Sequence, residues 1–253
     1  MGQDFLKKIR KLNWVLSEST TGTLSFEDLS QILRDVINAN VYILDKDGRV
    51  LGVAYTDADD TSTFENELGY ETVSDEDNRS FLKIQETAVN LIGESMEAVL
   101  GSQYHMLDKY HMIIPSVCGG QRRGTILLAR YGSRFDDEEV ALCEYGATVV
   151  GLEIQRHLQE ERARERSLRM AVDMALDTLS FSEKDALEKI IMQLENSEGI
   201  IIASKVASQY GLTNSVIVSA LKKLESARIL ETKSLGMKGT YIKVINPYLK
   251  EVL

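Results

Sequence analysis

The sequence predicts an α+β protein in which a domain of helices and strands is joined by a long helix to a smaller helix-turn-helix domain. Alternating strand patterns form hairpin pairs in the first half of the chain. A long helical pattern without proline follows. After it, two helices flank a glycine turn and precede a glycine-tipped hairpin. We therefore expect domains over residues 1–154 and 181–253, with a linker helix over 155–180.

Length and composition exclude several classes of protein. The 253 residues, 43% of them hydrophobic, suffice for one large or two modest domains. No stretch approaches the 18 apolar residues of a membrane span, so no membrane contact is expected. Cys118 and Cys143 are too isolated for a disulfide framework, which predicts a reducing, cytoplasmic location. The three histidines lack metal-ligand spacing, so no metal site is expected.

Two helices are expected at the start of the first domain. Apolar residues over 4–17 repeat at helical spacing. Ser25, followed three residues later by Asp28, is a capping-box pattern that opens a second helix through about Asn38.

Two hairpins are expected after these helices. The first covers residues 40–55, with Asp47 and Gly48 in the turn, and the second covers residues 110–132. Between them the chain is acidic and poorly patterned, and we expect one helix near residues 79–91 and loops elsewhere. This order of elements matches the small-molecule-sensing α+β domains of the GAF or PAS type.

The long helix is expected to begin at Asp136, an N-cap followed by an acidic first turn. Gly146 and Gly151 would each cost about 1 kcal/mol relative to alanine, so we expect the helix to approach a neighbour closely there. A charged stretch follows, and apolar spacing then resumes at Leu168, Val172, Ala175 and Leu179. This second apolar face needs a partner, which is either another copy of the chain or the next domain.

In the second domain, Ser182 is expected to cap a helix, and residues 199–202 to form a short strand. Ser204 then opens a helix that ends at Gly211, and Thr213 caps the next one. Helical spacing assigns four residues of this last helix to the core: Ile217, Ala220, Leu221 and Leu224. The opposite face carries short or polar side chains, namely Asn214, Ser215, Val218, Ser219 and Lys222. Such a face can enter a DNA major groove.

The charge of the chain is unevenly distributed. Its net charge of −10 argues against nucleic-acid binding, but residues 200–253 hold eight Lys or Arg and three Glu. That segment therefore carries +5, while the remainder, with 21 basic and 36 acidic residues, carries −15. The final hairpin has Lys238 between Gly236 and Gly239 at its tip, as in the wing of a winged helix. The residues predicted to contact duplex DNA are Ser204, Thr213, Asn214, Ser215, Val218, Ser219, Lys222, Lys223 and Lys238.

Two long segments are similar to one known family. Residues 203–244 read ASKVASQYGLTNSVIVSALKKLESARILETKSLGMKGTYIKV, and residues 113–154 contain IIPSVCGGQRRGTILLAR and FDDEEVALCEYGATVVGLEI. They resemble the DNA-binding domain and the second half of the GAF domain of the CodY family, nutrient-responsive transcriptional repressors of low-GC Gram-positive bacteria. Residues 33–52 match more loosely, and the resemblance covers about three quarters of the chain.

The resemblance implies a homodimer whose DNA affinity responds to GTP and, in many members, to branched-chain amino acids such as isoleucine. It implies that Lys46 and Arg49 meet the GTP phosphates, that Glu153 reads guanine, and that Tyr42 lines the amino-acid pocket. Three departures stand out: acidic residues dilute the phosphate turn, Leu158 replaces a usual lysine, and residues 57–68 lack the arginine that holds the amino-acid carboxylate. Asn214 also stands where a more basic residue is usual.

Two other functions compete with DNA-binding regulation. A winged helix can bind protein instead of DNA, which makes a protein-interaction module with a non-catalytic sensor domain the main alternative. An enzyme, such as a nucleotide hydrolase, would need a phosphate loop with metal-binding carboxylates or a nucleophile with a base. The sequence shows neither pattern, so no catalytic residues are predicted and the protein is not expected to be an enzyme.

Overall fold

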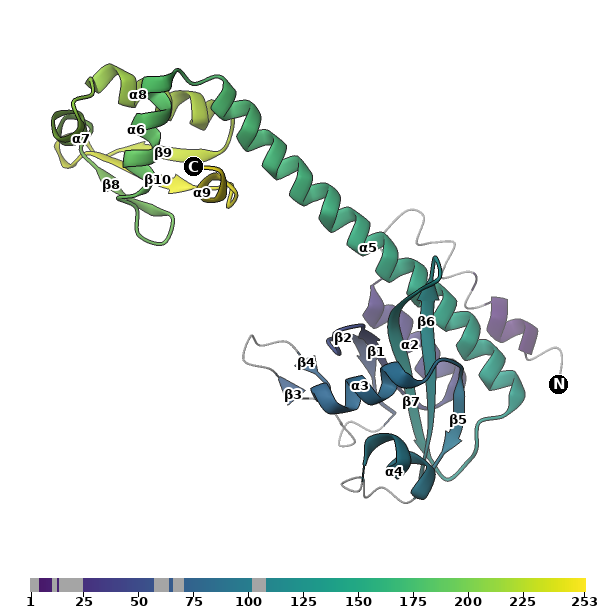
Figure 1. The fold of residues 1–253 in the computed structure, drawn as a ribbon. Helices are drawn as coiled ribbons and strands as arrows, with labels where there is room; N and C mark the ends of the chain where they lie inside the picture. The colour runs from purple at the N-terminus through teal and green to yellow at the C-terminus, as the bar shows by residue number, and fades with distance from the viewer. Residues whose placement is uncertain (1–4, 11–12, 14–24, 57–63, 66–70, 102–107) are drawn as a thin grey trace. The chain divides into compact units, whose positions relative to one another are not determined.

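The computed structural model describes residues 5–10, 13, 25–56, 64–65, 71–101 and 108–253. The chain divides into two compact units, an N-terminal unit of residues 1–158 and a C-terminal unit of residues 159–253 (Figure 1). Of the helix predicted over residues 4–17, residues 5–10 are described and are helical, and most of the remainder lies outside the described residues.

The N-terminal unit is built on a five-stranded antiparallel sheet with the order β2-β1-β7-β6-β5. Its strands are β1 (Asn40–Asp45), β2 (Val50–Ala54), β5 (Ala88–Leu91), β6 (Lys109–Cys118) and β7 (Gln121–Tyr131). The two predicted hairpins, β1–β2 and β6–β7, are both present. They are joined side by side because β1 pairs with β7 from Asn40 opposite Ala129 to Asp45 opposite Gly124.

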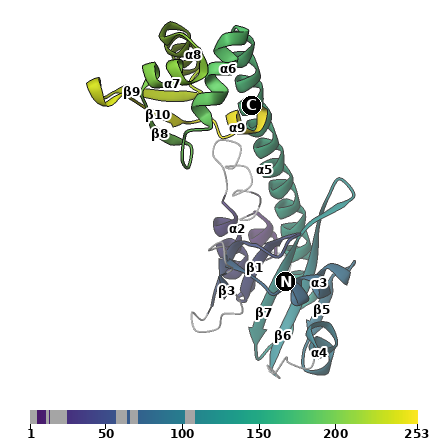
Figure 2. The same ribbon diagram turned by 60° about the vertical axis from the view of Figure 1, so that its left-hand side comes forward.

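Two helices cover one face of this sheet (Figures 1 and 2). α2 (Phe26–Ile37) begins at Ser25, and the predicted capping box is confirmed because the Ser25 hydroxyl accepts the Asp28 N–H while Asp28 accepts the Ser25 N–H. The first half of α5 (Asp137–Asp177) lies beside α2, and both pack on one apolar cluster with the sheet. That cluster joins Leu33 of α2 and Val150 of α5 to Ile43 and Met112 of the sheet.

The predicted close approach at the two glycines of α5 is confirmed. A Cβ at Gly146 would lie 3.0 Å from the side chain of Leu33, and one at Gly151 would lie 3.0 Å from the carbonyl oxygen of Val117. The helix also begins as predicted, since the Asp136 carboxylate accepts the N–H of Glu139 at 2.8 Å. Small residues are needed here because the helix lies directly on its neighbours.

The prediction for the segment between the hairpins was partly wrong. The helix there is α3 (Asp75–Lys83), which Ser74 caps, and residues 88–91 form β5 instead of helix. β5 exists because it pairs with β6, placing Ala88 opposite Ile113, a tertiary contact that local spacing does not reveal. The presumed loops also contain three short elements: β3 (Phe64–Glu65), β4 (Glu71–Thr72) and α4 (Glu94–Leu100).

The last turns of α5 belong to the core of the C-terminal unit. Val172, Ala175 and Leu179 are buried in one cluster with Leu187 of α6 (Phe181–Ile191) and Ile217 of α8 (Asn214–Ser226). Of the two partners considered for this face, the structure therefore shows the neighbouring domain. Leu168, the first residue of this predicted face, is not part of the buried cluster. Its backbone carbonyl accepts a hydrogen bond from the side-chain amide of Asn246 at 2.8 Å.

The C-terminal unit is a winged helix-turn-helix. After α6 come β8 (Glu198–Ile201), α7 (Ala203–Tyr210), α8, β9 (Leu230–Ser234), a 3₁₀ turn η1 (Gly236–Lys238), β10 (Thr240–Val244) and α9 (Leu249–Val252). The three strands form an antiparallel sheet in the order β8-β10-β9.

Two predicted helix starts in this unit were wrong. Ser180, not Ser182, caps α6, because Glu183 stands three residues after it and completes a capping box. α7 starts after Ile202 without a side-chain cap, so Ser204 lies within its first turn.

Candidate nucleic-acid interface and effector region

One glycine and one threonine build the turn between α7 and α8. Gly211 adopts the left-handed conformation, with φ of 67°, and its N–H donates to the carbonyl of Ala207. Thr213 then caps α8 by accepting the N–H of Val216 at 3.4 Å. Both predicted caps are confirmed, and they fix the end of α7 and the start of α8.

α8 divides its residues between core and solvent as its helical spacing predicted. The four predicted core residues are all buried: Ile217, Ala220, Leu221 and Leu224. Four of the five residues of the opposite face are exposed: Asn214, Ser215, Val218 and Lys222. Val218 alone contributes apolar surface there and is 38% exposed. This face offers hydroxyl, amide and ammonium groups without protruding bulk.

Ser219 and Lys223, also predicted to face DNA, are engaged within the unit. Both donate to the carboxylate of Glu183 on α6, each at 2.7 Å. Lys223 donates in addition to the carbonyl of Thr178 at 3.0 Å. The bond from Lys223, then those from Ser219 and the Ser180 backbone, lower the pKa of the Glu183 carboxyl from 4.5 to about 2.

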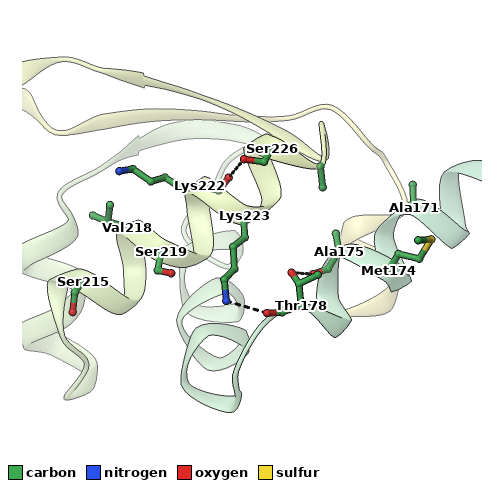
Figure 3. A pocket seen from close by; sticks show the side chains of 11 residues that line it. Ala171, Met174, Ala175, Thr178, Ser215, Val218, Ser219, Lys222, Lys223 and Ser226 are labelled. Carbon is green, nitrogen blue, oxygen red and sulfur yellow. Dashed lines mark hydrogen bonds between the residues drawn. The ribbon is translucent and has the colours of Figure 1, made fainter.

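A groove of about 940 Å³ runs between the last turns of α5 and α8. Met174 and Thr178 line it from α5 and the residues after it, and Val218, Lys222 and Lys223 line it from α8. Figure 3 shows Lys222 and Lys223 extending from α8 in different directions, with Lys223 reaching toward Thr178. Both lysines border the groove, and the ammonium of Lys223 has hydrogen-bond partners within the unit.

The predicted wing is formed by β9, η1 and β10. Gly236 and Gly239 have φ of 61° and 105°, and the N–H of Leu235 donates to the carbonyl of Gly239 at 2.8 Å. A Cβ at Gly239 would lie 2.3 Å from the carbonyl oxygen of Ile201, so only glycine fits. Lys238 is exposed at the tip beside Met237, and Ser204 is exposed on α7.

In the N-terminal unit, Lys46 and Arg49 are exposed in the turn between β1 and β2. The Asp45 carboxylate shapes this turn by accepting the N–H groups of Asp47 at 2.8 Å and Arg49 at 3.0 Å. Burial raises the pKa of Asp45, and these N–H donors oppose the rise. Lys46 lies 3.4 Å from Asp47, so the acidic residues noted in the sequence do reduce the positive charge of the turn.

Glu153 and Tyr42 lie in different surroundings. The Glu153 carboxylate forms an ion pair of 2.7 Å with Arg156, one turn further along α5. Leu158, at the position of the expected lysine, packs against the apolar cluster of the sheet. Tyr42 is buried on the other face of the sheet, with its ring edge-on to Tyr55 at 5.7 Å. Most of residues 57–68, predicted to border its pocket, lies outside the described residues.

Sequence reasoning missed Glu183, which joins α6 to α8. The pattern Ser-x-x-Glu at residues 180–183 could have identified it as a capping residue. Its bonds to α8 could not be foreseen, because they join residues 36 and 40 positions apart.

Within the described part of the chain, no group of three His, Cys, Asp or Glu residues could hold a metal ion. No helix there is both long and apolar enough to cross a membrane.

The two units together define a class of protein. An α+β unit of the sensor type and a winged helix-turn-helix with a polar, basic outer face form a ligand-responsive, DNA-binding transcriptional regulator. The family models agree: the CodY GAF-like domain matches residues 4–178, and the CodY helix-turn-helix domain matches residues 197–253. The chain belongs to the CodY family of global transcriptional regulators.

Relatives match nearly the whole chain. It is 39% identical to the global transcriptional regulator CodY of Clostridium perfringens over 250 residues, 98% of this chain and 97% of that one. It is 42% identical to that of Oceanobacillus iheyensis over 245 residues, 96% of this chain and 95% of that one. A solved cofactor-binding GAF domain of the nutrient sensor CodY from Clostridium difficile is 41% identical, with a TM-score of 0.50. That match covers 59% of this chain and 96% of the solved domain.

Proposed function

We propose that the exposed face of α8 enters the major groove of promoter DNA while the wing contacts the adjacent backbone. The division of α8 into a buried apolar face and an exposed polar face carries this proposal. Asn214 and Ser215 stand at the first turn of the helix, the part that contacts base edges in helix-turn-helix proteins. Lys222 and Lys238 supply ammonium groups for phosphates.

The DNA face is tested with Ser215→Arg and Lys222→Glu in a gel-shift or fluorescence anisotropy assay on a promoter fragment. We expect both to weaken binding by at least about tenfold, since good base and phosphate contacts contribute about 1–3 kcal/mol each. Lys250→Glu is the matched control, because it makes the same charge change on α9, which both views place away from α8 (Figures 1 and 2). Unchanged affinity in the two α8 variants would show that the face is wrongly assigned.

Salt dependence separates DNA binding from the alternative of a protein-interaction module. Lysines that neutralise phosphates release counterions, so affinity for DNA should fall steeply as salt rises. A flat dependence, or no shift with any duplex, would favour the alternative.

We propose that two copies of the chain bind one operator with two half-sites, as the two-fold symmetry of most helix-turn-helix regulators requires. Light scattering coupled to size-exclusion chromatography should then give about twice the chain mass of 28.4 kDa. A monomer at the concentrations that bind DNA would contradict this assembly.

We further propose that GTP is the effector, with Lys46 and Arg49 near its phosphates and Glu153 accepting from guanine. A carboxylate matches the two N–H donors on that edge of guanine. Arg156 engages one oxygen of this carboxylate in the structure, and a carboxylate has further acceptor sites for the N–H donors of guanine. The related Clostridium difficile domain is described as cofactor-binding, which is consistent with a ligand in this unit.

Calorimetry tests the effectors. We expect saturable GTP binding that Glu153→Gln weakens about tenfold or more, since hydrogen bonds to a charged group contribute about 1.5–3 kcal/mol. Isoleucine should bind weakly or not at all, because residues 57–68 supply no arginine for its carboxylate. We propose that the protein acts by binding and not by catalysis, so a phosphate-release assay with GTP should stay at background.

A further inference from the structure

Glu183 occupies the junction between α6 and the DNA-facing helix α8. The residue is only 6% exposed, and its carboxylate accepts hydrogen bonds from three donors. They are the backbone N–H of Ser180, the hydroxyl of Ser219 and the ammonium of Lys223, each at 2.7 Å. One carboxylate therefore completes the cap of α6 and joins α6 to two consecutive turns of α8.

The direction of Lys223 follows from its place on the helix. Ser219 and Lys223 are four residues apart and so lie on one stripe of α8, which faces α6. Lys223 also donates to the carbonyl of Thr178, so two of its three N–H groups have partners inside the unit, while 39% of its side chain is exposed. Lys222, one residue earlier, points about 100° around the helix and is exposed (Figure 3).

We propose that Glu183 is a positioning residue that orients the recognition helix and withdraws the charge of Lys223 from DNA. This inference rests on the proposed DNA face of α8. Lys222 is then the phosphate-contacting member of the adjacent lysine pair, and Ser219 and Lys223 belong to the support of the helix. The pair Glu183–Lys223 carries no net charge, so its approach to DNA releases few counterions.

The salt dependence of DNA binding shows which of the two lysines contacts phosphate. For duplex DNA, each phosphate contact contributes about 0.9 to the slope of log affinity against log salt. If Glu183 had only a structural role, its substitution would change the affinity for DNA but not the number of phosphate contacts, and the slope would stay the same. Substitution of both members of the pair by glutamine removes one charge of each sign and keeps the net charge constant.

The experiment measures fluorescence anisotropy of the full chain on a random-sequence duplex over a series of KCl concentrations. We expect Lys222→Gln to make this negative slope shallower by about 0.9. Glu183→Gln should steepen it by about the same amount, because Lys223 becomes available to phosphates. The double variant Glu183→Gln with Lys223→Gln should keep the wild-type slope.

Two outcomes overturn the inference in distinguishable ways. If the double variant loses as much slope as Lys222→Gln, Lys223 contacts DNA and the inference alone is wrong. If Lys222→Gln leaves the slope unchanged, the proposed DNA face is wrong, and the inference falls with it.

A measurement on the wild-type chain tests the inference even if the variants fail to fold. Brief acetylation with a water-soluble reagent, followed by mass spectrometry, compares the two lysines with and without the duplex. Lys222 should react quickly in the free protein and be protected by DNA. Lys223 should react slowly in both states, because its ammonium is engaged; rapid labelling that DNA suppresses would overturn the inference.

Discussion

The ion pair between Arg130 and Glu139 offers a sharp test of how the N-terminal unit is held together. Arg130, at the end of β7, donates to both carboxylate oxygens of Glu139 on the first turn of α5, at 2.6 and 2.7 Å. It also donates to the carbonyl of Ile37, the last residue of α2, at 2.9 Å. A single side chain thus joins the sheet to the two helices that cover it. The perturbation is Arg130→Ala.

The expected cost follows from the burial of the pair. The two side chains are only 11% and 14% exposed, so removal of the arginine leaves a carboxylate largely out of water. Breaking a buried pair in this way costs about 3–5 kcal/mol. Glu139 keeps one donor, the N–H of Asp136 at 3.0 Å, which favours the lower end, about 3 kcal/mol. Arg130→Lys should recover part of this, since it restores the charge but not the two-pronged geometry.

Hydrogen exchange of the β7 amides measures this cost within the N-terminal unit alone. A loss of about 3 kcal/mol should raise the open population, and hence the exchange rate, roughly a hundredfold. Arg134→Ala is the matched control, because Arg134 is exposed four residues away and surface substitutions usually stay within about 0.5 kcal/mol. If the Arg130→Ala and Arg134→Ala variants exchange alike, the pair does not stabilise the unit and the reasoning from burial is refuted.

Three further predictions concern the C-terminal unit. Gly239→Ala should destabilise the unit by more than about 2 kcal/mol in urea unfolding, because the new Cβ would lie 2.3 Å from a backbone oxygen. Gly236→Ala, where the space around the Cβ is open, should cost about 1 kcal/mol. Equal costs would contradict this account of the wing. Ile217→Ala should cost about 3 kcal/mol and Val218→Ala less than about 1 kcal/mol, since only the first is buried; the reverse order would mean that the faces of α8 are exchanged. Because the pKa of Glu183 is lowered on folding, its contribution to stability is present above about pH 4.5 and lost as the pH falls toward about 2. Acid titration should therefore destabilise the wild type more than Glu183→Gln over that range, and identical pH profiles would show that the carboxylate does not contribute.

Several features that the sequence predicted correctly are specified by neighbouring residues. The capping box of Ser25 and Asp28 involves residues three apart, and the left-handed turn at Gly211 depends on that glycine alone. The two faces of α8 follow from helical periodicity, which is also a local property. These features therefore need no knowledge of the tertiary fold.

The errors arose where distant contacts decide the structure. Residues 88–91 form a strand because β6 lies beside them, and that strand is some twenty residues further along the chain. The start of α6 was ambiguous, since Ser180 and Ser182 each precede an acidic residue by three positions. The structure selects Ser180, whose partner Glu183 also receives Ser219 and Lys223. A tertiary contact thus accompanies the choice between two locally similar caps.

Contacts between distant residues also limit how well net charge predicts DNA binding. The +5 of residues 200–253 counts every lysine in the segment, yet the partner of Lys223 is Glu183, which lies outside that segment. Counterion release depends on ammonium groups that reach phosphates, and screening confines the influence of other charges to about 8–10 Å. The net charge of −10 therefore does not by itself exclude DNA binding, and the +5 of residues 200–253 overstates the charge available to phosphates. Which of two adjacent lysines is available depends on a carboxylate 40 residues earlier in the chain.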